Sequence, residues 1–213
     1  MNSNSTYRFI STLAVLFSFY GAEAQTAPAL PKLVVNVVID QLRSDYLEAF
    51  APLYGEKGFR RLMQDGCVYT QAEYPFASPD RASATACLYT GATPYDNGIT
   101  SQRWLDRETL RPLYCVDDSK YKGHLTTEAS SPTHLSVSSI SDELKIATEG
   151  KGIVISVSPF RDAAILSAGH AADACFWLNE LTGQWCSTSY YGSYPSWALT
   201  YSRYNSLPQR IND

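Results

Sequence analysis

The feature that most constrains the fold is a near-continuous run of aliphatic and β-branched residues at positions 32–40 (KLVVNVVID). A strand with one solvated face alternates apolar and polar residues, whereas an unbroken apolar run is typical of a strand covered on both faces. Such strands belong to parallel sheets with helices on either side. The run ends in Asp40, and α/β folds bind their ligands at the carboxyl ends of such strands. The sequence therefore predicts an α/β domain with Asp40 at its functional edge.

The composition is that of a globular domain. Of the 213 residues, 45% are hydrophobic and 18% charged, which excludes a disordered tail, a collagen, a coiled coil and a multi-span membrane protein. The formal charge is −4, and the sequence pI is about 5.4. A protein that binds a nucleic-acid duplex through its phosphates is normally basic, so the charge argues against that class of partner.

Residues 1–24 have the pattern of a secretory signal peptide. Arg8 precedes an apolar run at positions 9–20, and Ala22-Glu23-Ala24 is a small-x-small cleavage site. The run is shorter than the roughly 20 helical residues that cross a bilayer. Cleavage predicts an exported protein, periplasmic or secreted, that begins with a linker at 25–31 and has no transmembrane segment. The alternative is an uncleaved amphipathic anchor.

Five cysteines in an oxidising compartment leave at least one thiol unpaired. Cys175 and Cys186 flank a turn-like segment, and a hairpin there could bring them face to face. We expect Cys67, Cys87 and Cys115 to pack as small hydrophobic residues. The absence of a CxxC motif argues against a structural zinc site built from thiolates.

Strand and helix patterns alternate along the rest of the chain, which predicts a doubly wound arrangement. The predicted helices are 44–50, 58–63, 78–89 and 139–148, and the predicted further strands are 68–72 and 152–157.

The start of the helix at 78–89 is unusually rich in polar groups. We place Ser78 at its N-cap, Pro79 at its first position, and Asp80, Arg81 and Ser83 in its first turn. A helix N-terminus attracts phosphate or sulfate, and a hydroxyl beside a carboxylate-bound metal makes a phosphoryl-transfer nucleophile. The alternative is that Ser78 is only a cap and Asp40 only a turn aspartate.

The three histidines, His124, His134 and His170, have no metal-ligand spacing to one another. His170 lies in an Ala-Gly-His-Ala segment typical of a packed turn. A Ser-His-Asp triad stays open, although no G-x-S-x-G elbow supports it, and neither a P-loop nor a dinucleotide fingerprint is present.

The segment 37–46 (VVIDQLRSDY) resembles the opening of the alkaline phosphatase superfamily. More narrowly, it is similar to the branch of secreted phosphate-monoester phosphatases and nucleotide pyrophosphatases/phosphodiesterases. The likeness continues in the family's order through 58–62, 88–94, 98–99, 139–144 and 164–170, and it covers residues 32–200.

This resemblance implies an α/β enzyme with a largely parallel, doubly wound sheet, helices on both faces and two zinc ions. The strand-ending aspartate that binds one zinc ion is Asp40 here. Family members are longer, and their other metal ligands lie in the later part of the chain. Residues 32–213 would then be the N-terminal part of an incomplete domain, in which only one zinc ligand is identifiable.

The resemblance also shows where the chain departs from the family. The nucleophile position, usually Thr or Ser, falls on Arg81, which offers only hydrogen-bond donors. The family's Asn after the Gly-Ile turn is Gln102, and its Lys-x-Arg pair falls on Phe160 and Asp162. Arg161, between these two, is still placed to reach a phosphate.

Two functions remain open. In the first, the protein hydrolyses phosphate mono- or diesters of small molecules or nucleotides. Ser78 or Ser83 replaces the nucleophile, Arg81 binds the anion, and Gln102 and Arg161 make secondary contacts. A sulfatase-like variant of this site would place the nucleophile on Ala77, which weakens it. In the second, the protein is a catalytically inactive exported binding module, whose aromatic-rich segment 185–204 suits a glycan or peptide.

Overall fold

The computed structural model describes residues 30–204. The predicted signal peptide and most of the predicted linker lie outside this range, so cleavage and export stay predictions. Residues 30–36 are the described part of a first unit; they contain no helix or strand, and every one is exposed. The helices and strands all belong to the second unit, which begins at Val37.

The prediction of a doubly buried strand at 32–40 is wrong for the described chain. None of these residues lies in a strand, and Leu33 and Val37 are 79% and 74% exposed. β-Branched residues fit a pleated, covered surface, but such a strand forms only where a neighbour takes up its backbone hydrogen bonds. Among the described residues, none pairs with this segment. The strand predicted at 68–72 is absent for the same reason.

The main sheet has four strands in the order β3-β6-β5-β4. β4 and β5 are parallel, whereas the β5–β6 and β6–β3 pairs are antiparallel. The α/β fold class is therefore confirmed, although the sheet within residues 30–204 is mixed rather than largely parallel. The bounds are β3 (Gly123–His124), β4 (Ile155–Ser158), β5 (Ala174–Leu178) and β6 (Trp185–Thr188). A separate antiparallel pair consists of β1 (Arg103–Leu105) and β2 (Pro112–Tyr114).

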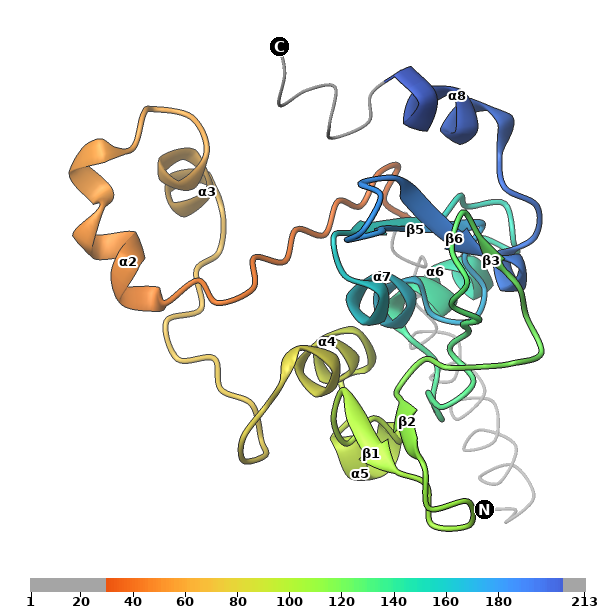
Figure 1. Ribbon diagram of the computed structural model, residues 1–213. Coiled ribbons are helices and arrows are strands. Elements are labelled where there is room, and N and C mark those ends of the chain that lie inside the picture. Colours follow the sequence, from red (N-terminus) through yellow and green to blue (C-terminus); the bar gives the residue numbers. More distant parts are fainter. Residues whose placement is uncertain (1–29, 205–213) are drawn as a thin grey trace, which may run out of the picture. The chain divides into compact units, whose positions relative to one another are not determined.

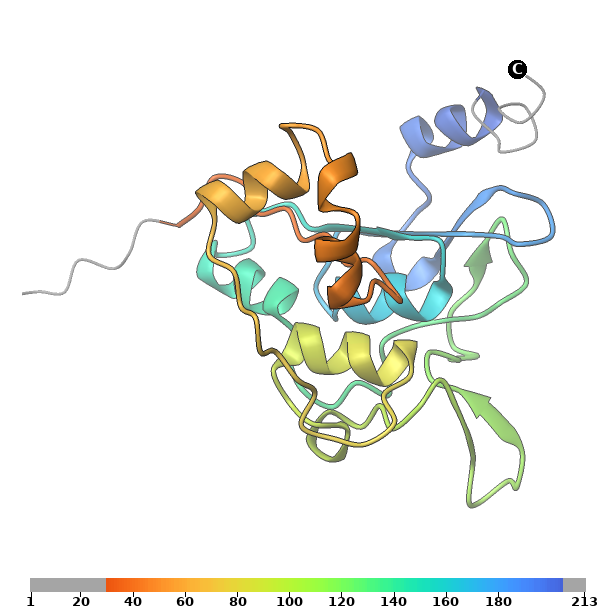
Figure 2. The same cartoon turned by 90° about the vertical axis from the view of Figure 1, so that its left-hand side faces the viewer.

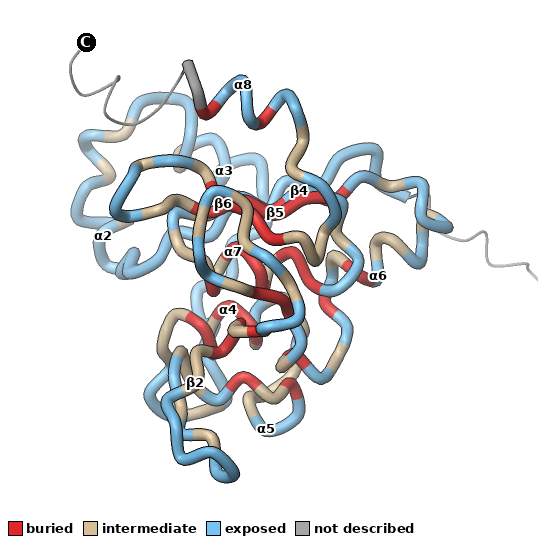
Figure 3. The backbone as a smooth tube through the Cα atoms, turned by 45° about the vertical axis from the view of Figure 1, so that its right-hand side comes forward, coloured by how far each residue is buried: buried red, intermediate tan, exposed pale blue. Residues whose placement is uncertain are grey.

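Both faces of β5 are covered, and alternate residues divide between two clusters. Cys175 and Trp177 belong to the larger core. Ala174 and Phe176 point the other way and pack with Ala198 of helix α8 (Ser196–Tyr204). Figure 3 shows the buried backbone concentrated in β5 and in the two helices α7 (Arg161–Ala168) and α4 (Arg81–Thr90).

The edge strand β4 is covered on one face only. Ser156 is buried, but Ile155 and Val157 are 51% and 60% exposed. The sequence correctly predicted a strand here, although its bounds and its burial on both faces differ. The connection from β4 to β5 runs through α7, which packs on these strands and makes the β-α-β unit visible in Figure 1.

Helix α4 packs closely against α7 (Figure 2). Its buried face is made of small residues, among them Ala82 and Ala86, and the facing helix contributes Ala164 and Ile165. Small side chains let two helix backbones approach, so α4 packs closely on a helix. This contact fixes the first turn of α4 beside the first turn of α7, and that junction carries the candidate site.

The remaining helices are α2 (Ser44–Ala49), η1 (Ala51–Leu53), α3 (Phe59–Asp65), α5 (Pro94–Asn97), α6 (Ile140–Ala147) and η2 (Ser189–Tyr191). Within the described range, no helix is long and apolar enough to cross a membrane.

All five cysteines are free thiols. Cys186 lies opposite Trp177 in the β5–β6 register, so Cys175 and Cys186 do not face each other across the hairpin. Cys115 is buried and packs as a small hydrophobic residue, as expected, whereas Cys67 is exposed.

Candidate functional site

The N-cap of α4 is Asp80 and not Ser78, so the helix begins two residues later than the sequence pattern predicted. The Asp80 carboxylate accepts hydrogen bonds from the backbone N–H and the hydroxyl of Ser83, each at 2.8 Å. Its second oxygen accepts the backbone N–H of Gln102. Asp80 therefore ties the helix start to the segment that precedes β1.

The two candidate nucleophiles differ in accessibility. Ser83 is 1% exposed, and its hydroxyl is held inside the capping box by Asp80. Ser78 is exposed and has a positive φ of 54°, an uncommon conformation for a residue other than glycine. Of the two hydroxyls, only that of Ser78 is open to a ligand.

Arg81 makes the central contact of the site. Its Nε donates to both oxygens of Asp162 on α7, each at 3.1 Å. Its guanidinium carbon lies 3.7 Å from the centre of the Phe160 ring, a cation–π distance. The Asp162 side chain is fully buried, whereas that of Arg81 is 24% exposed. Burial is the largest single influence and lowers the pKa of the guanidinium, but the hydrogen bonds and charges of Asp162 and Tyr114 together outweigh it and raise that pKa.

Gln102 completes this network. Its amide nitrogen donates to Asp162 Oδ2 at 3.0 Å and lies 3.4 Å from the Tyr114 hydroxyl. Burial, with a further contribution from the charge of Asp162, raises the pKa of Tyr114 to about 12. The phenol is thus neutral at physiological pH and available as a hydrogen-bond donor.

Arg161 is engaged elsewhere. Its guanidinium pairs with Asp117 at 3.0 Å and with Glu128 at 3.6 Å, and it stacks at 4.3 Å on the Tyr114 ring. Its side chain is 11% exposed and also donates to the Ser130 hydroxyl. A substrate contact by Arg161, as the sequence suggested, would require breaking these interactions.

Asp40 lies outside this network: no hydrogen bond or ion pair in the described part of the chain joins it to Arg81 or Asp162. Asp40 lies near Tyr74, whose pKa is raised by burial, by Cys87 and, as the smallest contribution, by the charge of Asp40. A protein zinc site usually takes three or four ligands. The described residues contain no group of three or more His, Cys, Asp or Glu side chains that would hold a metal. They do not by themselves make the expected zinc site.

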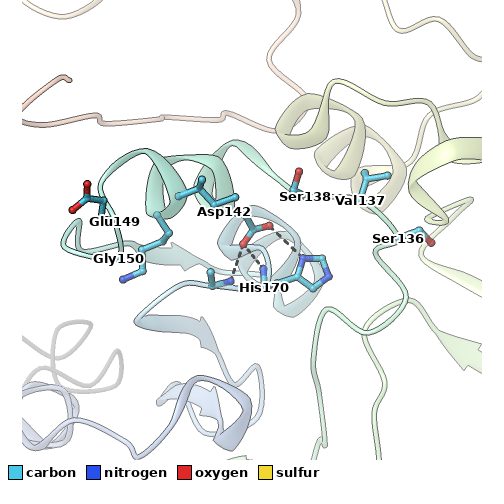
Figure 4. Close-up of a pocket in the computed structure, with 10 residues that line it drawn as sticks. Ser136, Val137, Ser138, Asp142, Glu149, Gly150 and His170 are labelled. Carbon is cyan, nitrogen blue, oxygen red and sulfur yellow. Dashed lines mark hydrogen bonds and ion pairs between the residues drawn. The ribbon is translucent and has the colours of Figure 1, made fainter. Parts of the chain in front are cut away.

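Away from the Arg81 site, a hollow lies between α6 and the turn at 169–171 (Figure 4). It has a volume of about 510 Å³, and His170 and Asp142 face each other in its wall. Asp142 accepts hydrogen bonds from the backbone N–H groups of Ser139, His170 and Ala171 and from His170 Nδ1. This carboxylate is saturated by partners, so it holds the turn onto α6 and is not free for proton transfer.

The packed role predicted for His170 agrees with this geometry. Its Nδ1 lies 3.2 Å from Asp142 and its Nε2 lies 3.0 Å from the Leu135 carbonyl oxygen. Both neighbours are acceptors, so the doubly protonated ring satisfies both contacts. The hydrogen bond to Asp142 is the largest cause of the raised pKa of His170.

The structure thus brings together Arg81 and Gln102, and adds Asp80, Asp162 and Tyr114, which the sequence did not single out as site residues. One signal was available: an Asp followed three residues later by a hydroxyl residue is a capping-box spacing, and it would have placed the cap on Asp80. The arrangement offers a buried ion pair with a partly exposed guanidinium, which can bind an oxyanion.

Comparison with known proteins supports the resemblance. The family model for type I phosphodiesterase / nucleotide pyrophosphatase matches residues 34–213. Alkaline phosphatase PhoV of Synechococcus elongatus is 39% identical over 173 residues, which are 79% of this chain and 32% of the relative. The crystal structure of alkaline phosphatase PafA matches with a TM-score of 0.83 at 31% identity, over 88% of this chain and 37% of that one. The chain spans about a third of each relative.

A crystal structure of a PafA variant also matches, with a TM-score of 0.77 at 30% identity, over 82% of this chain and 34% of that one. In that variant, one Thr is replaced by Ser, and one Asn, one Lys and one Arg by Ala. The altered Thr and Asn are 21 positions apart, as are Arg81 and Gln102. The altered Lys and Arg are two positions apart, as are Phe160 and Asp162.

Proposed function

Because the chain belongs to the type I phosphodiesterase / nucleotide pyrophosphatase family, we propose that it is part of an exported hydrolase of phosphate mono- or diesters. The observation that carries this proposal is the partly exposed guanidinium of Arg81 at the start of α4, stacked on Phe160 and anchored by Asp162. A guanidinium binds two oxygens of a phosphate with parallel N–H groups, which fixes the orientation of the ester.

Within this proposal, Ser78 is the nucleophile, because the hydroxyl of Ser83 is buried in the cap. Arg81 itself cannot attack phosphorus: it has no lone pair to offer while it is protonated. The neutral Tyr114 and the Gln102 amide add donors next to Arg81. Asp40 would contribute one ligand to a zinc site, with the remaining ligands supplied from outside the described residues.

Activity and metal content test the proposal together. The purified chain is assayed with p-nitrophenyl phosphate and bis(p-nitrophenyl) phosphate, with and without added zinc, and bound zinc is measured after dialysis. Hydrolysis that falls to background in Ser78→Ala and persists in Ser119→Ala, an exposed serine distant in sequence, is the expected result. Unchanged hydrolysis in Ser78→Ala would reject Ser78 as the nucleophile. Zinc retained in the parent chain and lost in Asp40→Asn would support the metal assignment.

A second candidate function is favoured by one specific observation: the family's nucleophile position holds Arg81, and the buried Asp162 fixes it there. A chain that binds inorganic phosphate, turns over neither ester with or without zinc, and loses phosphate binding in Arg81→Met would be an inactive binding module. Calorimetric titration with phosphate, alongside the activity assay, separates the two functions.

A further inference from the structure

Three separate segments of the chain bring four residues together around the guanidinium of Arg81. Arg81 comes from α4, Gln102 from the segment before β1, and Phe160 and Asp162 from the start of α7. The Asp162 carboxylate accepts hydrogen bonds from Arg81 Nε at 3.1 Å and from the side-chain amide of Gln102 at 3.0 Å. The centre of the Phe160 ring lies 3.7 Å from the guanidinium carbon of Arg81. We call these four residues the Arg81 cluster.

The spacings reported above match these positions to those altered together in the PafA variant. That enzyme has Thr, Asn, Lys and Arg at the matched positions, a set with two positive charges. In this chain the set carries one positive charge, on Arg81, and one negative charge, on Asp162. The net charge of the four positions is therefore zero.

Two other arginine side chains approach the cluster through the Tyr114 ring: Arg103 at 5.3 Å and Arg161 at 4.3 Å from the ring centre. The charge of Arg161 is opposed by both Asp117 and Glu128, and Arg103 is exposed to solvent, which screens its charge. Asp80, bonded to the backbone of Gln102, adds a further negative charge at the same end of α4. A ligand at Arg81 therefore meets one guanidinium amid several carboxylates.

We infer that Asp162 is a positioning and specificity residue: it holds Arg81 through Nε and selects singly charged tetrahedral oxyanions over doubly charged ones. The inference rests on the proposed contact between Arg81 and the anion. Its ligand class is a phosphodiester or a sulfate ester, since both present tetrahedral oxygens with one negative charge. A phosphate monoester carries nearly two charges at neutral pH and is disfavoured, because among the described residues its second charge meets the carboxylates of Asp162 and Asp80 and no second guanidinium of the Arg81 cluster.

Three probes with the same phenyl group separate the possibilities: phenyl phosphate, methyl phenyl phosphate and phenyl sulfate. Each is titrated calorimetrically into the whole chain at pH 8. We expect the two singly charged esters to bind about tenfold more tightly than phenyl phosphate, the effect of one extra unit charge at a few ångströms in a partly solvated site. The tighter of the two singly charged esters identifies the source of the oxyanion.

The variant Asp162→Asn removes the charge and keeps the side-chain size, so it should abolish the preference by raising the affinity for phenyl phosphate about tenfold. Glu149→Gln, an exposed residue paired with Lys151, changes the net charge equally and should leave all three affinities unchanged. An unaltered preference in a folded Asp162→Asn protein overturns the inference.

A second measurement needs no variant. At pH 5 phenyl phosphate is singly charged, because the second pKa of a phosphate ester is about 6. Its affinity relative to methyl phenyl phosphate should then rise about tenfold in the parent chain. A constant ratio overturns the inference while leaving the proposed anion contact intact, whereas failure of all three probes to bind at either pH rejects the proposed function itself.

Discussion

Removing the positive charge of Arg81 should leave the buried carboxylate of Asp162 without its cation. Asp162 is fully buried, and among the described residues its hydrogen bonds come from Arg81 Nε and the Gln102 amide. Arg81→Met keeps an unbranched apolar side chain over the Phe160 ring but leaves the carboxylate without its cation. The variant therefore isolates the electrostatic contribution from most of the packing contribution.

Breaking a buried ion pair from one side typically costs about 3–5 kcal/mol, because the remaining charge stays desolvated. The Gln102 hydrogen bond survives, and the 24% exposure of Arg81 gives water a route to the site. Both effects put the expected loss near the lower end, at about 3 kcal/mol of unfolding free energy. That loss corresponds to a change in the unfolding equilibrium constant of more than a hundredfold.

Urea denaturation followed by tryptophan fluorescence measures the effect. The double variant Arg81→Met with Asp162→Leu should recover most of the loss, because an apolar pair of similar volume can replace a buried ion pair at little cost. Arg107→Met, at an exposed arginine, is the matched control and should stay within about 0.5 kcal/mol of the parent. A loss below about 1 kcal/mol for Arg81→Met, with an unchanged slope against urea, would refute the reasoning.

Three further predictions concern the caps and the turn at 169–171. The pKa of His170 is raised, chiefly by its hydrogen bond to Asp142. The contribution of His170 to stability is therefore complete below its ordinary pKa of about 6.5 and is lost as pH rises through the raised value. In His170→Asn, the unfolding free energy should lose this pH dependence between about pH 6 and 9. The pKa of Asp142 is lowered: burial opposes this shift, but hydrogen bonds from His170 and from backbone N–H groups outweigh it. Asp142→Ala should therefore cost about 3 kcal/mol at pH 7, whereas the parent should lose the Asp142 contribution only as pH falls below about 4. Gly169→Ala should lower stability by at least about 2 kcal/mol in thermal unfolding, since φ is +69° and the added Cβ would overlap the Ser139 hydroxyl; an unchanged melting temperature would contradict this geometry.

The local chemistry of the helices could be read from the sequence. The helix at 139–148 was predicted from its amphipathic spacing, and the structure has α6 there, with a capping box formed by Ser139 and Asp142. The helix predicted at 78–89 is α4, although it begins at Arg81. These features depend on residues within a few positions of each other. The α/β class followed from the alternation of segments, which is also local information.

The burial of strands could not be read from the sequence. The run at 32–40 has the composition of a covered strand, yet burial depends on partners elsewhere in the polypeptide. The ion pair between Arg81 and Asp162 was equally hidden: the two residues are 81 positions apart, and the resemblance placed both at family site positions without pairing them. Only the packing of α4 on α7 connects them.

The pairing of Arg81 with a buried Asp162 also restricts how such a sequence can change over generations. A single substitution to a hydroxyl residue at position 81 leaves the Asp162 carboxylate buried without a cation. A single substitution to arginine at position 162 places two guanidinium groups next to each other, and they repel. Each one-step path back toward the composition of the PafA set therefore passes through a destabilised protein. The two positions should be inherited as a pair, so that descendants of this sequence carry both residues or neither.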